Sequence, residues 1–329
     1  MRNSSPAFPL LVVDIGGTHV RFGWVAAAGE IIQEIRAYRC GDFASPVDAA
    51  HRYLSEAGVP QVAHAAVAIA SVVARGPIKL TNSQWIFEAD AFGASVGAGT
   101  VEVFNDFEAI ALVLPFLTAR DYQIVGTAAF NPALPLAVLG PGTGLGMAGI
   151  QPVRGQPGNW QTICGEGGHT SIPSATRYQH AVIAAARHEI AHVSAEGLVS
   201  GLGLPTLYRA VARVEGLAAE DIGAAEIGAR GASGSDPLAA RTLDTFCGFL
   251  GSIAGNLALT LGAQGGVFIA GGIVPQWGDF FAGSSFREHF EDKGRYRDYL
   301  AAIATGVITA PYPGLMGLAQ HAARSLPAR

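Results

Sequence analysis

Three glycine-rich loops, each following an apolar run, are the parts of this sequence best suited to chemistry. They are DIGGT (14–18), GTGLG (142–146) and AGG (270–272). Because glycine lacks a Cβ, consecutive backbone N–H groups can turn outward at such loops, and a concave row of N–H groups binds phosphate. Asp14 stands beside the first loop, where its carboxylate is placed to hold a hydrated Mg²⁺ that bridges phosphates. The three loops in this order predict a nucleotide site.

The first loop also fits a simpler interpretation. The stretch from Val12 to Thr18 and the alternating run that follows predict a β-hairpin whose glycine tip takes positive φ. An ordinary hairpin turn, however, needs neither an Asp before its glycines nor a Thr after them. The chain contains no GxxxxGK[ST] and no GxGxxG that opens a helix, so a P-loop and a dinucleotide fold are both disfavoured.

The elements that must position these loops alternate between apolar strands and helices. Strands are expected at 64–70, 100–104, 136–139 and 265–274, and helices at 45–57, 106–114, 176–192, 204–215, 243–261 and 314–324. Ser45 is the expected N-cap of the first helix, with Pro46 at its first position. The Gly/Ala/Ser-rich stretch 227–236 is expected to be a connection. This alternation is typical of an α/β fold with a largely parallel sheet.

Composition narrows the class of protein. The 329 residues are 14% charged with a net charge of −5 and no block of like charge, which gives no reason to expect nucleic acid or a membrane as partner. The three cysteines (Cys40, Cys164 and Cys247) are too far apart for a zinc knuckle and fit a reducing compartment. No run approaches the length of a membrane span. We therefore expect a cytoplasmic protein.

Two polar motifs lie outside the glycine loops. Asn105-Asp106 ends a strand and opens a helix, where Asp106 would be a good N-cap. His188–His192, HEIAH, matches the HExxH zinc-protease pattern on a predicted helix, and Glu215 is the only third ligand that can be suggested. The zinc interpretation is the weaker one because the pattern identifies no third ligand.

The order DIGGT, TNSQW, FNDF, GTGLG, GEGGH, HVSAEGLVSG, GGVFIAGGIVP and FEDKGR resembles that of the bacterial glucokinases, almost from end to end. That family belongs to the hexokinase/actin/Hsp70 superfamily of ATP-binding proteins. The resemblance implies a two-lobed α/β fold of the actin-like ATPase (ribonuclease H-like) type with an interlobe cleft. The small lobe would comprise 1–112 and the C-terminal helix 313–329, and the large lobe 113–312.

The resemblance also implies an activity, namely ATP-dependent phosphorylation of D-glucose at its 6-hydroxyl by a homodimer, with Asp106 as general base. The implied sugar ligands are Asn105, Asp106, Glu166, His169 and Glu196. The implied ATP-binding residues are Val13, Asp14, Ile15, Gly16, Gly17, Thr18, Gly142, Thr143, Gly144, Gly271 and Gly272, with Mg²⁺ held on Asp14 through water.

Some details depart from the family or stay open. The family commonly has Asn where this chain has His19, and Asn82 in TNSQW is a further, weaker sugar-site candidate. The cysteine zinc motif of the sugar-kinase group that includes repressors is absent, since Cys164 stands alone in its region. Alternatives are a kinase for mannose or fructose, and a regulator that binds sugar and nucleotide without catalysis. The sequence does not decide whether ADP or polyphosphate replaces ATP.

Overall fold

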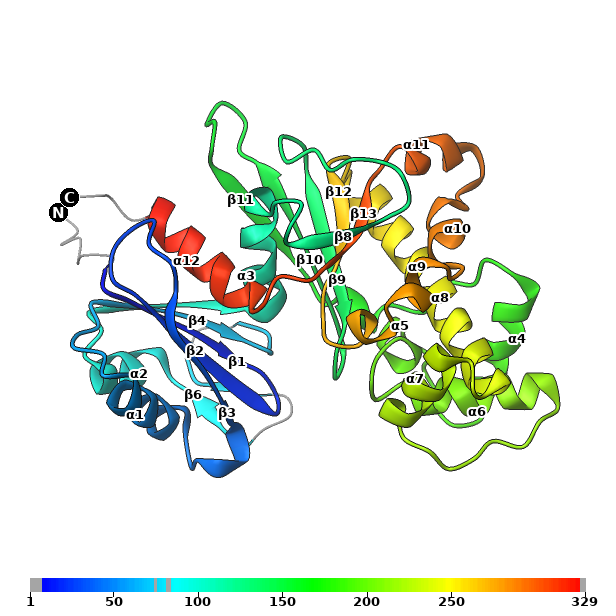
Figure 1. The fold of residues 1–329 in the computed structure, drawn as a ribbon, viewed down its shortest axis with the longest axis horizontal. Helices are drawn as coiled ribbons and strands as arrows, with labels where there is room; N and C mark the ends of the chain where they lie inside the picture. Colours follow the sequence, from blue (N-terminus) through cyan, green and yellow to red (C-terminus); the bar gives the residue numbers. More distant parts are fainter. Residues whose placement is uncertain (1–7, 74–75, 81–83, 326–329) are drawn as a thin grey trace. The chain divides into compact units, whose positions relative to one another are not determined.

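The computed structural model describes residues 8–73, 76–80 and 84–325, and this part of the chain has a mixed α/β architecture (Figure 1). The chain divides into two compact units. Unit 1 comprises Met1–Phe116, Val153–Cys164 and Pro311–Arg329, and unit 2 comprises Leu117–Pro152 and Gly165–Ala310. The boundaries of these units differ from those of the expected lobes at residues 113–116, 153–164 and 311–312, which belong to unit 1. The segment 153–164 clusters with unit 1 because β11 (Trp160–Cys164) packs on helix α3, where Thr162 Oγ1 donates to Glu108 Oε1 at 2.7 Å.

The sheet of unit 1 has the strand order β3-β2-β1-β4-β7. Its strands are β1 (Leu10–Ile15), β2 (His19–Val25), β3 (Gln33–Arg39), β4 (His64–Ile69) and β7 (Thr100–Asn105). β1 and β2 form the expected antiparallel hairpin, whereas β1, β4 and β7 are parallel. All six residues of β4 are buried, as expected of a parallel strand covered on both faces. The mixed sheet thus presents the carboxyl ends of three parallel strands at one edge.

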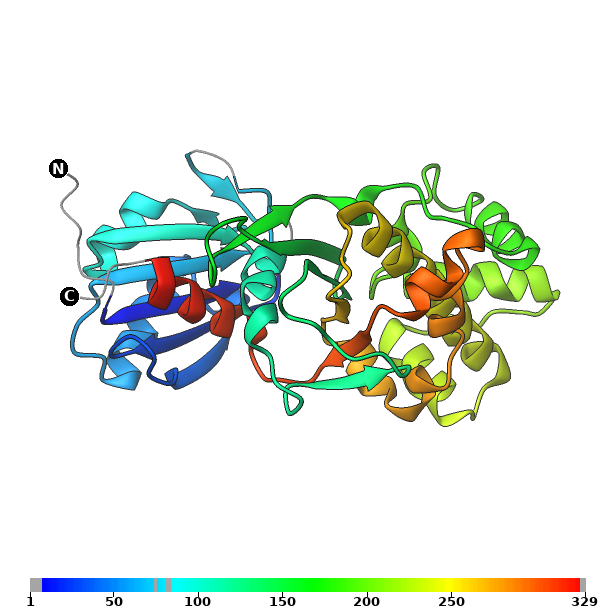
Figure 2. The same ribbon diagram turned by 90° about the horizontal axis from the view of Figure 1, so that it is seen from above.

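Helices cover both faces of this sheet. α1 (Pro46–Ala57) and α2 (Ala89–Val96) lie on one face, and α3 (Asp106–Val113) and α12 (Pro313–Ser325) lie side by side on the other (Figures 1 and 2). The Ser45 hydroxyl caps α1, as predicted, by accepting from the Asp48 N–H. Gly317 allows α12 to approach α3, because a Cβ there would overlap the carbonyl oxygen of Ala109. The remaining elements are η1 (Cys40–Asp42), β5 (Ile78–Lys79), β6 (Ile86–Phe87) and η2 (Leu114–Phe116).

The strands of the second sheet that belong to unit 2 run in the order β10-β9-β12-β13-β8. They are β8 (Tyr122–Val125), β9 (Leu136–Pro141), β10 (Leu145–Pro152), β12 (Gly266–Ile269) and β13 (Thr305–Ile308). β9 and β10 are an antiparallel hairpin, and β9 is parallel to β12, which is parallel to β13. This repeats the arrangement of the opening hairpin, as the second glycine loop predicted.

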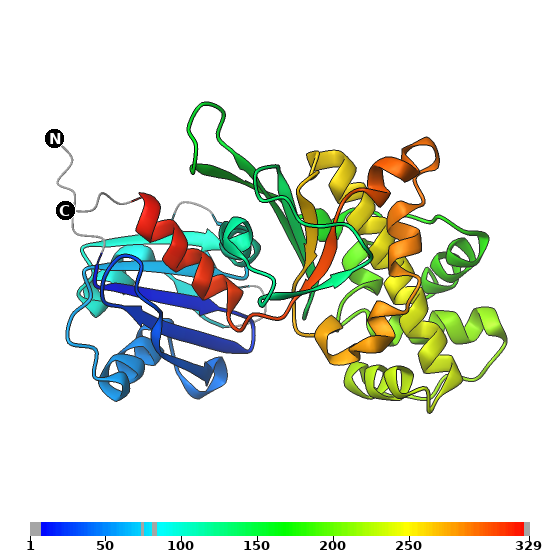
Figure 3. The ribbon, with the colours of Figure 1, turned by 45° about the horizontal axis from the view of Figure 1, so that its top comes forward.

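The helices of unit 2 are organised around α8 (Pro237–Leu261), whose N-cap is Asp236. α10 (Phe286–Glu291) runs close beside α8 (Figure 3). Gly251 and Gly255 of α8 allow this approach, since a Cβ on either would overlap backbone atoms of Phe286 or Phe290. The other helical elements are η3 (Gly167–His169), α4 (Arg177–Ala186), α5 (Ala195–Leu198), α6 (Leu204–Glu215), α7 (Ala224–Ser233), η4 (Val274–Trp277), α9 (Asp279–Ala282), η5 (Gly294–Tyr296) and α11 (Arg297–Ala301). Among the described residues, no helix combines the length and apolar character needed to cross a bilayer.

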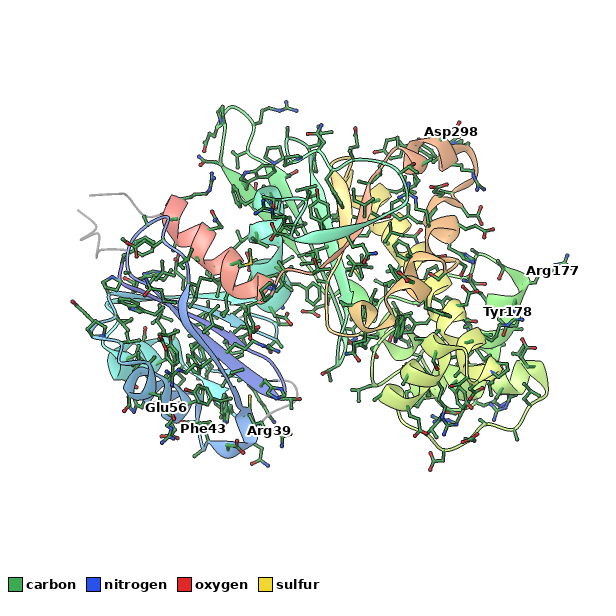
Figure 4. The ribbon with its side chains drawn as sticks, in the orientation of Figure 1. Arg39, Phe43, Glu56, Arg177, Tyr178 and Asp298 are labelled. Atoms are coloured by element: carbon green, nitrogen blue, oxygen red, sulfur yellow. The ribbon has the colours of Figure 1, made fainter. Side chains whose placement is uncertain are left out.

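Two predicted elements were wrong. The helix expected at 176–192 ends at Ala186, so that HEIAH (188–192) lies in a turn and a bend. The N–H groups of His188 and Glu189 donate to carbonyls three residues back, and the Ile190 N–H makes the last bond, to the Ala186 carbonyl. Figure 4 shows Arg177 at the start of this helix, pointing away from its neighbours.

The stretch 227–236, expected to be a connection, forms most of α7. Gly231 fits closely against Leu243 of α8, so tertiary packing overrides the low helix propensity of glycine.

Candidate functional site

The carboxyl edge of the unit 1 sheet brings two of the predicted motifs together. In the register of the parallel strands, Ile15 lies beside Ile69, and Ile69 lies beside Asn105. DIGGT and Asn105-Asp106 therefore emerge from the same edge, with β4 between their strands. Two strand spacings correspond to about 10 Å. Candidate sites of α/β proteins lie at this edge because the loops that follow the strands converge there.

Asp14 is the charged group of the first loop. Its Oδ2 accepts from Arg21 Nη1 at 3.2 Å across the hairpin, and its side chain is 20% exposed. Burial raises the pKa of Asp14 above its ordinary value and outweighs the opposing effect of Arg21. A nearby cation would stabilise the ionised form of such a carboxylate. A partly exposed carboxylate oxygen also fits Mg²⁺ that keeps most of its waters.

The glycine tip of the first hairpin differs from the prediction of positive φ. The φ of Gly16 is not in the left-handed region. Its N–H donates to the carbonyl of His19 at 2.9 Å, and a Cβ would lie 3.2 Å from that oxygen. Glycine is therefore favoured here by close approach and not by backbone conformation. Since the Gly16 N–H is used inside the hairpin, Gly17 and Thr18 are the remaining candidates in this loop for contacts with phosphate.

Asn105 and Asp106 lie at the start of α3, where the sequence suggested Asp106 as the N-cap. The N-cap of α3 is Asn105, whose Oδ1 accepts from the N–H groups of Phe107 and Glu108 at 2.9 and 3.3 Å. Its Nδ2 donates to the carbonyl of Ser71 at 3.3 Å. Asp106 is the first residue of the helix, where the helix dipole favours a negative charge. Asp106 Oδ1 also accepts from the Phe107 N–H, at 3.0 Å, so both side chains bond to N–H groups of the first turn, although the N-cap position belongs to Asn105.

The remaining predicted sugar ligands belong to unit 2. Glu166 immediately precedes η3, and His169 ends it, with the His169 N–H donating to the Glu166 carbonyl at 3.1 Å. His169 Nδ1 lies 4.0 Å from Glu196 Oε1, and the two side chains are 62% and 33% exposed. Gly168 places η3 against the start of β10, because a Cβ there would overlap the Leu145 carbonyl. Asn82 lies outside the described residues.

The second glycine loop is held by residues far along the chain. Glu196 Oε2 accepts from the Leu145 N–H at 2.8 Å. A Cβ on Gly144 would overlap the same carboxylate, so a side chain at this position would displace the Glu196 carboxylate from the Leu145 N–H. Nothing in the sequence signalled this contact, because the two partners are 51 residues apart. It joins the predicted phosphate loop to a predicted sugar ligand.

A cavity of about 460 Å³ opens beside this loop. It is lined by Gly142, Thr143, Gly201, Leu202, Leu204, Ala224, Ala225, Gly228, Ala229, Ile273, Gln276 and Trp277. Four of these residues form one face of α7, and their small side chains leave room for a flat ring. The sequence carried a signal that was missed, namely Ala and Gly at positions i, i+1, i+4 and i+5 of 224–229.

The third glycine segment lies against the second. Gly271 has a φ of +90°, and a Cβ on it would overlap the Pro141 carbonyl. A Cβ on Gly140 would likewise overlap the Ala270 carbonyl. The residues that follow, Ile273 and Gln276, line the cavity. The AGG segment therefore packs against residues 140–141, just before GTGLG, and the cavity is lined by Gly142 and Thr143 of GTGLG and by residues that follow AGG.

The HEIAH motif does not have the geometry of a zinc protease, since its residues are not on a helix. Glu189 forms an ion pair with Arg209, with O–N distances of 2.7 and 3.0 Å, and this guanidinium lowers the pKa of Glu189. Within residues 8–73, 76–80 and 84–325, no group of three or more His, Cys, Asp or Glu side chains is arranged to hold a metal ion. Glu189 therefore has a structural partner, Arg209 on α6.

Comparison with known proteins agrees with this architecture, which is the actin-like ATPase fold. Residues 11–325 match the glucokinase family, and the chain belongs to that family. It is 43% identical to a glucokinase of Chromobacterium violaceum over 323 residues, covering 98% of this chain and 92% of that protein.

Solved structures show the same relationship. A glucokinase from an Antarctic psychrotroph superposes with a TM-score of 0.84 at 33% identity, covering 94% of this chain and 97% of that one. The glucokinase of Balamuthia mandrillaris, solved in complex with glucose, has a TM-score of 0.79 at 20% identity and covers 96% and 93% of the two chains. At that identity the second likeness supports the fold alone.

Proposed function

We propose that this protein is a glucokinase that transfers the γ-phosphoryl group of ATP to the 6-hydroxyl of D-glucose. One observation carries the proposal. Within unit 2, His169 lies 4.0 Å from Glu196, and Glu196 bonds to the glycine loop that borders a cavity of about 460 Å³. Hydroxyl ligands, a phosphate loop and a cavity of suitable size for a nucleoside are the parts that a sugar kinase needs.

Asp106 is the general base of the proposed reaction. A sugar hydroxyl is a poor nucleophile unless its proton is accepted as the new O–P bond forms. The 6-oxygen attacks the γ-phosphorus, the bond from that phosphorus to the bridging oxygen breaks, ADP leaves with the electron pair, and the proton passes to the Asp106 carboxylate. The position of Asp106 at the start of α3 favours the ionised form that accepts this proton.

The sugar ligands proposed are Asn105, Asp106, Glu166, His169 and Glu196. Carboxylates and an imidazole suit a hexose because each hydroxyl both donates and accepts hydrogen bonds. Asn105 uses its oxygen and one N–H within unit 1, so its second amide N–H is the group available to a hydroxyl. Leaving any such partner unpaired costs binding energy, which is how polar sites discriminate between substrates.

For the nucleotide we propose contacts from residues 13–18, where Gly17 and Thr18 are the candidates for backbone contacts with phosphate, and from 142–144 and 271–272, with the adenosine in the cavity beside α7. Asp14 would hold Mg²⁺ through water, and this ion would supply neutralisation of the charge that develops on the transferred group. We also propose that the enzyme works in the cytoplasm as a homodimer, which the family resemblance implies. The small residues of α7 support the adenosine position, since they leave a flat apolar surface.

The test is a coupled assay of ADP production with Mg-ATP and a panel of glucose, mannose and fructose. We expect ADP production that depends on glucose and a higher kcat/KM for glucose than for the other hexoses. A preference for mannose or fructose would reassign the substrate. Binding of sugar and nucleotide without turnover would contradict catalysis and favour a regulator.

A further inference from the structure

Residues 195–202 contact both proposed ligand sites of unit 2. Glu196, on α5, faces the proposed sugar ligand His169. The N–H groups of Gly201 and Leu202 donate to the carbonyls of Gly142 and Thr143, at 2.8 and 3.4 Å. Gly201 and Leu202 also line the cavity proposed for the nucleoside. One short segment therefore touches the sugar side, the phosphate loop and the nucleoside cavity.

This segment is internally braced. Ser200 Oγ donates to the Glu196 carbonyl at 2.7 Å and accepts from the Gly203 N–H at 2.9 Å. Ser200 is fully buried, and a Cβ on Gly203 would overlap backbone atoms of Glu196 and Gly197. We therefore expect a displacement of the Glu196 backbone to move Gly201 and Leu202 as well, because hydrogen bonds and close packing hold these residues together.

The Glu196 carboxylate divides its oxygens between the two sites. Oε2 accepts from the Leu145 N–H at 2.8 Å, and Oε1 lies 4.0 Å from His169 Nδ1. A hydrogen bond to an ionised acceptor is about twice as strong as one between neutral groups. Loss of the carboxylate would leave the loop N–H without its acceptor and would free the loop to adopt other conformations.

We propose that Glu196 is a positioning residue for the phosphate loop, through which occupancy of the sugar site raises the affinity of the nucleotide site. This rests on the proposed function, since it assumes that a sugar binds beside Oε1. A hydroxyl that binds Oε1 restrains the carboxylate, and the restrained Oε2 holds Leu145 and the loop in the conformation that receives phosphate. By linkage, bound nucleotide must raise sugar affinity by the same factor.

The decisive measurement is the Kd of a non-hydrolysable ATP analogue with Mg²⁺ and no sugar, by isothermal titration calorimetry. Glu196→Ala should weaken this sugar-free binding on the order of 10-fold, because the loop loses a charged acceptor. Glu196→Gln keeps a carbonyl oxygen for the Leu145 N–H, so its effect should be smaller. Glu166→Ala is the matched control: it removes another proposed sugar ligand of unit 2 and should leave the sugar-free Kd unchanged.

A pair of glycine variants tests the same contact from the loop side. Gly144→Ala places a methyl group on the Glu196 carboxylate, whereas a Cβ on Gly142 meets no atom within 4 Å. Gly144→Ala should therefore raise the glucose Kd, measured without nucleotide, by roughly 5- to 10-fold. Gly142→Ala, in the same loop, should leave that glucose Kd unchanged even where it weakens nucleotide binding.

An unchanged sugar-free nucleotide Kd in Glu196→Ala would overturn the proposal, and so would equal glucose Kd values for the two glycine variants. Thermal unfolding of each variant identifies one that fails to fold, in which case the Glu196→Gln and glycine data decide. Failure of the proposed function is a separate result, recognised by wild-type protein that produces no ADP in response to any hexose.

Discussion

The glycine loops after β1 and β9 belong to the same kind of hairpin, but they are held in different ways. The first is closed by its neighbours in sequence: Gly16 bonds to His19, and Asp14 pairs with Arg21 on the adjoining strand. The second is held by Glu196, Gly201 and Leu202, more than fifty residues downstream. The charged side chain beside the first loop, Asp14, belongs to that loop's own hairpin. The charged side chain beside the second loop, Glu196, belongs to a distant segment and is itself a proposed sugar ligand.

This difference predicts which ligand's binding a mutation in each loop will change. A change in the first loop should act on nucleotide and metal and leave sugar binding unaltered. A change in the second loop should reach the sugar through Glu196. The following variants are ordered from the largest expected effect to the smallest.

Asp14→Ala removes the charge that is intrinsic to the first loop. We expect kcat/KM for Mg-ATP to fall on the order of 10²-fold, because the proposed metal loses its protein anchor. Glucose Kd, measured without nucleotide, should stay within twofold of wild type. A loss of glucose binding as large as the loss of activity would contradict the separation of the two loops.

Gly228→Leu tests the cavity beside the second loop. Gly228 faces Trp277, with an added Cβ only 3.1 Å from Nε1, so a leucine side chain would fill space proposed for the nucleoside. We expect nucleotide Kd to rise at least 10-fold, which corresponds to about 1.4 kcal/mol. Ser233→Leu, exposed near the end of the same helix, adds the same side chain outside the cavity and is the control. Equal nucleotide affinities for the two variants would place the nucleoside elsewhere.

Unit 1 should also lose stability in acid. Glu102 accepts from His64 on β4 at 3.0 Å and faces His321 on α12 at 3.5 Å. Bonding to His321 and then to His64 lowers the pKa of Glu102 to about 2. A lowered folded-state pKa stabilises the protein above the ordinary value of 4.5, and this contribution disappears as the pH falls toward 2.

The measurement is the free energy of unfolding in urea at pH 6 and pH 3, for wild type and Glu102→Gln. Because Glu102 is about one-third exposed, we expect the wild type to lose about 1–2 kcal/mol more than the variant over this range. Equal losses would show that the two histidines do not stabilise the Glu102 carboxylate.

Gly16→Ala should have the smallest effect. The new methyl group would lie 3.2 Å from the His19 carbonyl, a contact that a small shift of the hairpin can relieve. We expect a two- to fivefold rise in the KM for ATP, or less than about 1 kcal/mol, with no change in glucose Kd. A changed glucose Kd would show that the first loop, like the second, communicates with the sugar site.

Features that depend on neighbouring residues were predictable from the sequence. Ser45 and Pro46 set the start of α1, and both hairpins follow from alternating apolar residues around glycine. Features that depend on distant partners were not. The helix α7 forms because Gly231 packs on α8, and HEIAH lies in turns where Glu189 pairs with Arg209. The N-cap of α3 is Asn105, one residue before Asp106, which the sequence suggested as the N-cap.

The site shows the same division. The glycine loops were predicted from residue type and position along the chain, and the role of Asp106 was predicted from the family resemblance. The contact between Glu196 and Leu145 was not, since no local pattern marks two residues 51 positions apart. The cavity wall was missed in part because Gly228 and Ala229 fall in the stretch 227–236, which was expected to be a connection.

The most direct test of the account is the turnover of Asp106→Ala with saturating glucose and Mg-ATP, measured together with its glucose Kd. If Asp106 is the general base, kcat should fall on the order of 10²-fold or more while the glucose Kd changes by only a few-fold. A variant that keeps near wild-type turnover would contradict the proposed mechanism.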